Sequence, residues 1–199
     1  MHAELEAVIC SGSRRGRQFT YALLDERAPA ARSLPRDAAL AALAGRYFTS
    51  HGPATAKDFA WWSGLTLKDA RAGIERASPA LQAVAADGLT YFAAATERFR
   101  HRARPTTLLL PNYDEFLIAY KDRGLSVHPR ARVPGSNPIF AHQVVMDGYV
   151  TGSWSRSIGA RQAAIEVRPY TRMSAADRAR VRQAAEAFGR FIGRPVRLT

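Results

Sequence analysis

The sequence predicts an α+β protein whose first half is mainly helical and whose second half is β-rich and closed by a C-terminal helix. Three patterns carry this prediction. Apolar residues recur at helical spacing between residues 35 and 77, Asp-Gly pairs at 87–88 and 147–148 separate apolar runs, and a helical period begins at residue 174. A chain of 199 residues has room for one large or two small domains.

Composition and charge narrow the class of protein. Apolar residues make up 47% and charged residues 23%, which excludes a disordered, collagen-like or coiled-coil chain. Lysine and arginine outnumber the acidic residues 29 to 17, so the net charge is +12. This charge favours a polyanionic partner, nucleic acid ahead of an anionic membrane, although arginine is also frequent in proteins from GC-rich genomes.

Cysteine content and hydropathy bear on the compartment. The single cysteine, Cys10, excludes a disulfide within the chain and favours a reducing environment. No run approaches 18 apolar residues, and no secretory signal pattern opens the chain. We therefore expect a cytoplasmic protein without a membrane span, associated with the nucleoid if its partner is DNA.

Three helices are expected between residues 35 and 77. Pro35 suits the first turn of an amphipathic helix that ends near residue 50. Thr55 with Asp58 forms a capping box that opens a second helix, and Thr66 repeats the pattern for a third. The apolar faces of the first and third helices consist of Leu40, Leu43, Ala44, Tyr47 and Phe48, and of Leu67, Ala70, Ile74 and Ala77.

A hairpin follows these helices, because the apolar runs 81–85 and 89–93 flank Ala86-Asp87-Gly88. The order of helix, helix, tight turn, helix and hairpin is that of a winged helix-turn-helix, in which the third helix can enter a major groove and the hairpin lies over the flanking backbone. Two alternatives stay open: another small α+β domain, and a winged helix that contacts only protein.

Residues 1–34 repeat part of this order. A helical segment at 1–7 precedes two apolar runs, 8–12 and 19–24, which flank Ser13-Arg14-Arg15-Gly16-Arg17. We expect residues 1–34 to be the remnant of a preceding winged helix with a linker, and the chain to be truncated at its start.

The region from residue 106 onward is predicted to be a barrel-like sheet with one helix. Ser174 with Asp177 forms a third capping box, which opens a helix over 174–193, and 123–138 is expected to be a surface loop. The predicted strands are 108–110, 116–120, 140–146, 149–154 and 163–167. The expected domains are 1–34, 35–105 and 106–199.

Motifs of enzyme sites are weak in this sequence. The five histidines lack metal-ligand spacing, and the glycines form no phosphate-binding loop, so neither metal nor cofactor is expected. Gly152-Ser153-Trp154-Ser155-Arg156 lacks the closing glycine of a nucleophile elbow.

Asp114 and Glu115 point to opposite faces of an extended segment, so we expect Asp114 to cap a turn and Glu115 to pair with an arginine. Asp114 remains the one catalytic candidate.

Basic residues gather where a winged helix meets DNA: at the tip of the first hairpin, on the outer side of the third helix, and after the second hairpin. Any one such cluster is more often a solvated face than a binding site, but all of them coincide with the expected binding elements. The predicted DNA-binding residues are Arg14, Arg15, Arg17, Lys68, Arg71, Arg76, Arg98, Arg100 and Arg102.

Several segments carry a family resemblance. Three of them resemble the second winged helix of the AlkZ-like winged-helix DNA-binding proteins: Arg46-Tyr47-Phe48, His51-Gly52-Pro53-Ala54-Thr55 and the run from Asp58 to Thr66. The segments that are similar to the later β-rich region of that family are Leu109-Leu110-Pro111-Asn112-Tyr113-Asp114-Glu115-Phe116, Tyr120-Lys121-Asp122-Arg123 and Gly152-Ser153-Trp154.

The resemblance implies tandem winged helices and a β-barrel around duplex DNA, and DNA glycosylase activity on alkylated or crosslinked bases. It also implies a catalytic motif of glutamine, an apolar residue, and glutamine or aspartate, in the first winged helix. None of the glutamines here, Gln18, Gln82, Gln143, Gln162 and Gln183, forms that motif. The resemblance therefore implies the C-terminal two-thirds of a glycosylase-like protein.

Three hypotheses for the function follow. The preferred one is a monomeric module that binds double-stranded DNA without catalysis. The second is a full DNA glycosylase, if the true start lies upstream. The third is a winged helix for protein interaction, if the positive charge is only compositional.

Overall fold

The computed structural model of the chain describes residues 2–31, 33–96, 105–133 and 141–199. The chain divides into two compact units, Met1–Ala39 and Leu40–Thr199. Helices and sheets both contribute to the fold, so the expected α+β class is confirmed.

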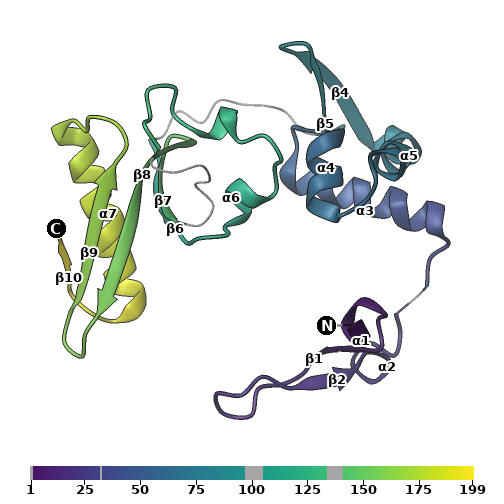
Figure 1. Cartoon of the computed structure of the whole chain (residues 1–199), viewed down its shortest axis with the longest axis horizontal. Coiled ribbons are helices and arrows are strands. Elements are labelled where there is room, and N and C mark those ends of the chain that lie inside the picture. Colours follow the sequence, from purple (N-terminus) through teal and green to yellow (C-terminus); the bar gives the residue numbers. More distant parts are fainter. Residues whose placement is uncertain (1, 32, 97–104, 134–140) are drawn as a thin grey trace. The chain divides into compact units, whose positions relative to one another are not determined.

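The first unit is a hairpin with two short helices (Figure 1). After α1 (His2–Leu5), β1 (Ile9–Ser11) pairs antiparallel with β2 (Tyr21–Leu23), as the apolar runs predict. The short helix α2 (Leu24–Arg27) was not predicted from the sequence, and its first turn carries two acidic residues, which favour a helix start. None of the described side chains in residues 2–39 is buried, so both faces of the hairpin contact solvent.

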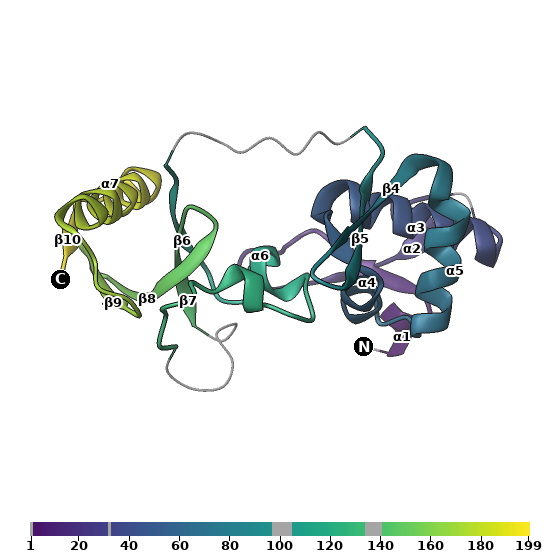
Figure 2. The ribbon, with the colours of Figure 1, turned by 90° about the horizontal axis from the view of Figure 1, so that it is seen from above.

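The three helices expected between residues 35 and 77 are present: α3 (Arg36–His51), α4 (Ala56–Ser63) and α5 (Leu67–Ala77) (Figure 2). All but the first four residues of α3 belong to the second unit. Thr55 caps α4 in a complete capping box, since its hydroxyl accepts from the backbone N–H of Asp58. Thr66 caps α5 through its hydroxyl, which accepts from the backbone N–H of Asp69.

The core of this helical region is aromatic. Tyr47, Phe48 and Phe59 are almost completely buried, and the ring of Phe59 lies 5.1 Å from that of Tyr47 and 5.5 Å from that of Phe48. Gly73 allows α5 to approach α3, because a Cβ there would lie 2.8 Å from the carbonyl oxygen of Leu40. Burial of this cluster stabilises the packing of the three helices.

A three-stranded sheet completes the helical region. Its order is β3-β5-β4, formed by Ala54–Thr55, Leu89–Ala94 and Leu81–Ala86. Asp87 and Gly88 both have positive φ angles, 49° and 73°, as a two-residue turn of type I′ requires. The hairpin predicted from this Asp-Gly pair is therefore present.

The β-rich region forms a curled, five-stranded half-barrel sheet in the order β10-β9-β8-β7-β6. The parallel pair is β10 with β9, and the other neighbours are antiparallel. The strands, from β6 to β10, are Thr107–Leu110, His142–Met146, Tyr149–Ile158, Ala163–Pro169 and Val196–Leu198. The short β10 was not predicted from the sequence.

The C-terminal helix α7 (Ala175–Ile192) packs against this sheet, as expected (Figures 1 and 2). Its buried Val181 and Ala185 contact Val144, Trp154 and Ile165 of the sheet. A second cluster, on Val145 and Val150, holds the segment that follows β6. The sheet is therefore buried on two sides along β7.

One predicted strand is wrong. Residues 116–120 were expected to be extended, but α6 (Glu115–Ile118) occupies most of this run. Asp114 caps α6, because its Oδ1 accepts from the backbone N–H of Phe116 at 3.0 Å. An apolar run this short has no period that distinguishes a buried helix turn from a strand.

The loop expected at 123–138 contains a 3₁₀ turn, Gly124–Ser126, and its positions 134–138 lie outside the described residues.

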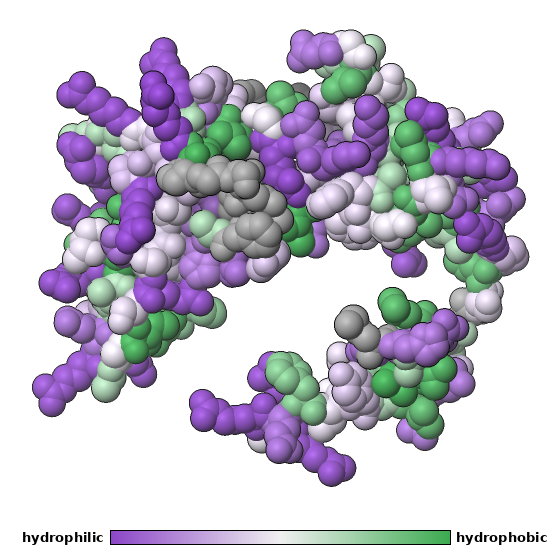
Figure 3. Space-filling model, in the orientation of Figure 1, coloured by the Kyte–Doolittle hydropathy of each residue, from purple (hydrophilic) through white to green (hydrophobic). Residues whose placement is uncertain are grey.

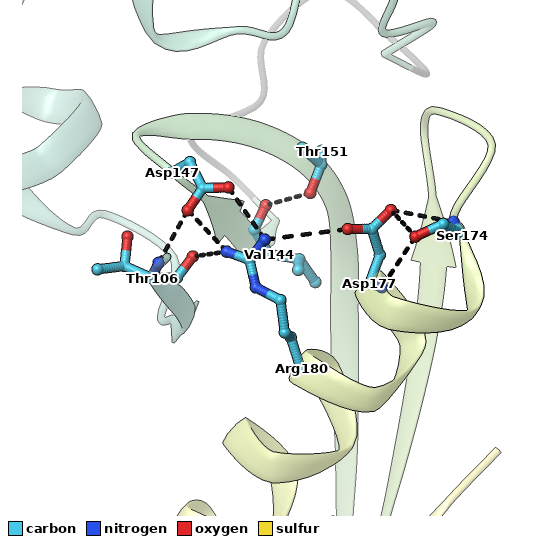
Figure 4. A network of polar contacts seen from close by, with 7 residues as sticks. All are labelled: Thr106, Val144, Asp147, Thr151, Ser174, Asp177 and Arg180. Atoms are coloured by element: carbon cyan, nitrogen blue, oxygen red, sulfur yellow. Dashed lines mark hydrogen bonds and ion pairs between the residues drawn. The ribbon is translucent and has the colours of Figure 1, made fainter. Parts of the chain in front are cut away.

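Arg180 of α7 joins the helix to the sheet through a polar network (Figure 4). Its guanidinium donates to both carboxylate oxygens of Asp147, at 2.7 and 3.0 Å, and to the carbonyl oxygen of Thr106 at 2.5 Å. The hydrogen bonds from Arg180 hold the pKa of Asp147 below its usual range. The network therefore fixes α7 against the β7–β8 turn while Asp147 is ionised.

We expect Arg180→Ala to lower the free energy of unfolding by about 1–2 kcal/mol at about pH 7, since the pair is partly exposed to solvent. A carboxylate with a depressed pKa stabilises the fold above its unfolded pKa and loses that effect as pH falls through its folded pKa. The difference between wild type and variant should therefore shrink at about pH 3.

Urea unfolding at both pH values measures this effect. Arg182→Ala is the matched control, because Arg182 is an exposed arginine on the same helix. A loss for Arg180→Ala that is equal at both pH values would show that the Asp147 contact does not carry the stabilisation.

Candidate nucleic-acid interface

The tip of the first hairpin carries three predicted site residues. Arg15 and Gln18 exchange two backbone hydrogen bonds, of 3.1 and 3.2 Å, around a two-residue turn at Gly16 and Arg17. Gly16 has a φ of 61°, which suits the first central position of a type II′ turn. Arg14, Arg15 and Arg17 are all exposed, and hydrophilic side chains project from this end of the hairpin in Figure 3.

An aromatic side chain lies beside these arginines. The guanidinium carbon of Arg14 lies 4.3 Å from the centre of the Phe19 ring, within the range of a cation–π contact. Phe19 itself is 78% exposed. Phe19 was not predicted from the sequence as a site residue; the bridge between Arg15 and Gln18 places position 14 across from position 19.

The second predicted cluster lies on α5. Lys68, Arg71 and Arg76 are exposed, while Ala70 and Ile74 of the same helix are buried in the aromatic core. The helix therefore presents its cations to solvent, as its periodicity predicts. The third cluster, Arg98, Arg100 and Arg102, lies outside the described residues.

A groove of about 1340 Å³ runs beside α5, between that helix, the β4–β5 hairpin and residues 116–126. Arg71, Lys57 and Lys121 supply positive charge to its lining, and Tyr91 and Phe116 supply aromatic surface. Acidic residues also line it, among them Asp58, Glu75, Asp87 and Asp122, so its charge is mixed.

The catalytic candidate Asp114 caps the start of α6, in agreement with the capping role that the sequence predicted for it. The expected pairing of Glu115 with an arginine is not found among the residues that the structure describes. Oε2 of Glu115 instead lies 3.3 Å from Nε2 of His51 and accepts from Nε1 of Trp62 at 3.2 Å. The helix turn of α6 aims Glu115 at α3 and α4, which no local pattern indicates.

The segment that contains α6 is bound to α3 and α4 by further polar contacts. The hydroxyl of Tyr47 donates to the carbonyl oxygen of Ala119 at 2.9 Å, and the hydroxyl of Tyr120 donates to that of His51 at 2.9 Å. Burial raises the pKa of both phenols, and the nearby Asp58 carboxylate raises it further. Both tyrosines are therefore hydrogen-bond donors at physiological pH.

Asp58 is the buried centre of these contacts, at 6% exposure. Its Oδ2 accepts from the backbone N–H and hydroxyl of Thr55, at 2.9 and 2.7 Å. Its Oδ1 accepts from the backbone N–H of Lys121 at 2.8 Å. Only the local part of this role, the capping box with Thr55, was predictable from the sequence.

The part of the chain that the structure describes contains neither a group of metal-ligating side chains nor a membrane-spanning helix. Within residues 2–31, 33–96, 105–133 and 141–199, no three His, Cys, Asp or Glu side chains are grouped to hold a metal ion. No helix within those ranges has the length and apolar character needed to cross a membrane.

Comparisons with known proteins give the family. The family model described as DNA glycosylase AlkZ-like matches residues 1–191. The fold is similar to that of Streptomyces sahachiroi DNA glycosylase AlkZ, with a TM-score of 0.74 and 23% sequence identity over 97% of this chain. This chain spans 55% of the length of that protein, and no curated protein sequence matches it significantly. Because the family model covers nearly the whole sequence, the chain belongs to the DNA glycosylase AlkZ-like family.

Proposed function

We propose that this chain is a monomeric module that binds double-stranded DNA through a winged helix-turn-helix and a basic hairpin. In this proposal α3, α4 and α5 are the three helices, and β4–β5 is the wing. Three residues separate α4 from α5: Gly64 in the αL conformation, Leu65 and the cap residue Thr66, a spacing that suits a helix-turn-helix. Contact with duplex DNA would place the protein at the nucleoid.

We further propose three segments with different roles. Residues 35–105 form the winged helix, residues 106–199 form the β-rich domain, and residues 1–34 are the wing of a preceding winged helix with its linker. The β1–β2 hairpin and the short α1 before it support the last assignment, because they follow the order of α5, β4 and β5.

The observation that carries the DNA-binding proposal is the solvent-facing row of cations on α5. Lys68 and Arg71 lie one turn apart on the exposed side of the helix that a winged helix-turn-helix inserts into the major groove. The net charge of +12 and the arginines at the hairpin tip support the same partner. Contacts of this kind go mainly to phosphates, so we expect little sequence preference.

Fluorescence anisotropy with a labelled duplex of about 20 base pairs tests the proposal, with salt varied from about 50 to 200 mM. Each phosphate neutralised should contribute a slope of about −0.9 to log K against log salt. The double variant Lys68→Ala/Arg71→Ala should bind more weakly and reduce the magnitude of the slope by about 2.

The matched control is Arg161→Ala/Arg172→Ala, which removes two exposed arginines of the β-rich region. It loses the same charge, so it measures the effect of net charge alone. Undetectable or salt-independent binding by the wild type would refute the proposal. Equal losses for the two double variants would refute the assignment of α5 as the contacting helix.

Base excision by a full glycosylase is the second candidate function, favoured by the family match. It predicts release of an alkylated base, whereas the binding proposal predicts binding without release. The third candidate, protein interaction, is favoured by the apolar part of the groove beside α5, and it predicts that duplex binding is absent.

A further inference from the structure

Phe19 is a large apolar side chain at a position where the fold does not need one. It is 78% exposed, and Tyr21, two residues further along the chain at the start of β2, is 62% exposed. None of the described side chains of residues 2–39 is buried, so these rings do not complete a core within their unit. Two neighbouring exposed aromatics at the end of a hairpin indicate a contact surface.

The Arg14 guanidinium indicates which kind of ligand this surface binds. It lies 4.3 Å from the centre of the Phe19 ring and so covers one face of it. Because 78% of Phe19 remains exposed, the opposite face of the ring is open. A flat ring with a cation on one side and an open face on the other can extend a stack of planar groups.

The charge around the ring points to phosphate. Residues 7–24 contain Arg14, Arg15 and Arg17 and no acidic residue. The turn between Arg15 and Gln18 holds these cations within a few residues of Phe19. Aromatic rings interleaved with basic side chains are the combination that binds nucleic-acid bases and backbone together.

We propose that the tip of the β1–β2 hairpin is a binding site for an unpaired or loosened base within duplex DNA. Phe19 stacks its open face on the base, with Arg14 on the far side of the ring, while Arg15 and Arg17 contact the neighbouring phosphates. This inference rests on the proposed DNA-binding function and adds to it a preference for locally distorted duplex. Loosened bases favour such insertion because they cost less to unstack.

An anionic membrane is the competing partner for a basic, aromatic hairpin. Insertion of Phe19 into lipid would draw the stacked Arg14 guanidinium below the headgroups, where an ion is costly. In a nucleic-acid stack the same guanidinium stays beside phosphate. The geometry of the Arg14–Phe19 pair therefore favours DNA.

The experiment compares two duplexes of about 20 base pairs, one fully paired and one with a single bulged 2-aminopurine, whose fluorescence falls when the base stacks. The wild type should prefer the bulged duplex roughly 5- to 100-fold and quench the probe. Phe19→Ala should abolish the preference and the quenching and leave the salt slope unchanged. Phe19→Tyr should retain both, because a tyrosine ring also stacks.

Two control variants separate stacking from charge and from general surface effects. Arg15→Ala should reduce the magnitude of the salt slope by about 0.9 and keep the bulge preference. Phe191→Ala, which removes an 86% exposed phenylalanine from α7, should change neither.

The outcomes distinguish this inference from the proposed function. Wild-type binding to paired duplex without a bulge preference, or a Phe19→Ala variant that behaves like Phe191→Ala, overturns the base-stacking site alone. Absence of any duplex binding overturns both proposals. Loss of binding to vesicles of phosphatidylserine and phosphatidylcholine in Phe19→Ala, with DNA preference unchanged, overturns the site in favour of a membrane.

Discussion

Replacing Asp58 by alanine should lower the free energy of unfolding by about 3–5 kcal/mol. The carboxylate is buried and accepts from Thr55 on one oxygen and from the backbone N–H of Lys121 on the other. Its removal uncaps α4 and leaves buried donors without a partner, which costs more than the loss of an exposed hydrogen bond. Urea unfolding followed by circular dichroism measures the change.

Asp177→Ala is the matched control. Asp177 occupies the same position in the capping box of Ser174 at the start of α7, but its carboxylate is one-third exposed. It should cost only about 1 kcal/mol, the usual effect of a lost cap. If the two variants are equally destabilising, the bond from Asp58 to Lys121 contributes nothing to the fold.

Elements that depend on local residues were predictable from the sequence. The capping box of Thr55 and Asp58 gives the start of α4, and the Asp87-Gly88 pair gives the β4–β5 hairpin, because the residues involved lie within four positions of each other. The C-terminal helix follows from Ser174 and its regular period in the same way.

Elements that depend on distant partners were not predictable. Strand β10 is three residues long and exists through its parallel pairing with β9. The turn of helix at Glu115–Ile118 is stabilised by contacts of Leu117 with Val145 and Val150 of the sheet. Tertiary contacts decide the structure of such short apolar runs, and single-residue propensity does not.

The residues of the candidate site also differ in whether local spacing predicts them. The exposed cations of α5 follow from its period, since Lys68 and Arg71 lie opposite the buried Ala70 and Ile74. The contacts of Glu115 with His51 and Trp62 join segments that are distant in the sequence, so no spacing reveals them. The Arg14–Phe19 contact is intermediate, because it depends on the local turn closed by the Arg15–Gln18 bridge and not on a distant segment, but the sequence alone does not show where that turn closes.

The rate of excision of alkylated bases is the measurement that should differ most between a glycosylase and a module that only binds DNA. Enzymatic acceleration is typically at least roughly 10⁶-fold over the uncatalysed reaction, so its presence or absence in this chain is unambiguous. Release of a flipped base requires a polar group that orients the attacking water. The family resemblance assigns that group to a Gln-apolar-Gln or Gln-apolar-Asp motif, which the 199 residues do not contain.

We therefore expect this chain, tested alone, to release N7-methylguanine from a duplex at no more than the spontaneous rate of depurination. Single-turnover release from a labelled duplex measures it. Asp114→Asn and Glu115→Gln are the informative variants, because these neighbouring carboxylates lie at the start of α6. Asparagine is as good a helix cap as aspartate, so Asp114→Asn should leave α6 intact.

The release rates of the wild type and the two variants show whether a catalytic group is present and where it lies. Release well above the spontaneous rate by the wild type would refute the binding-only proposal. If Asp114→Asn then removed the activity without a change in stability, the water-orienting group would lie at α6 in the β-rich half. If both carboxylate variants kept it, the group would lie elsewhere in the chain, and the helix-capping role of Asp114 would be its whole contribution.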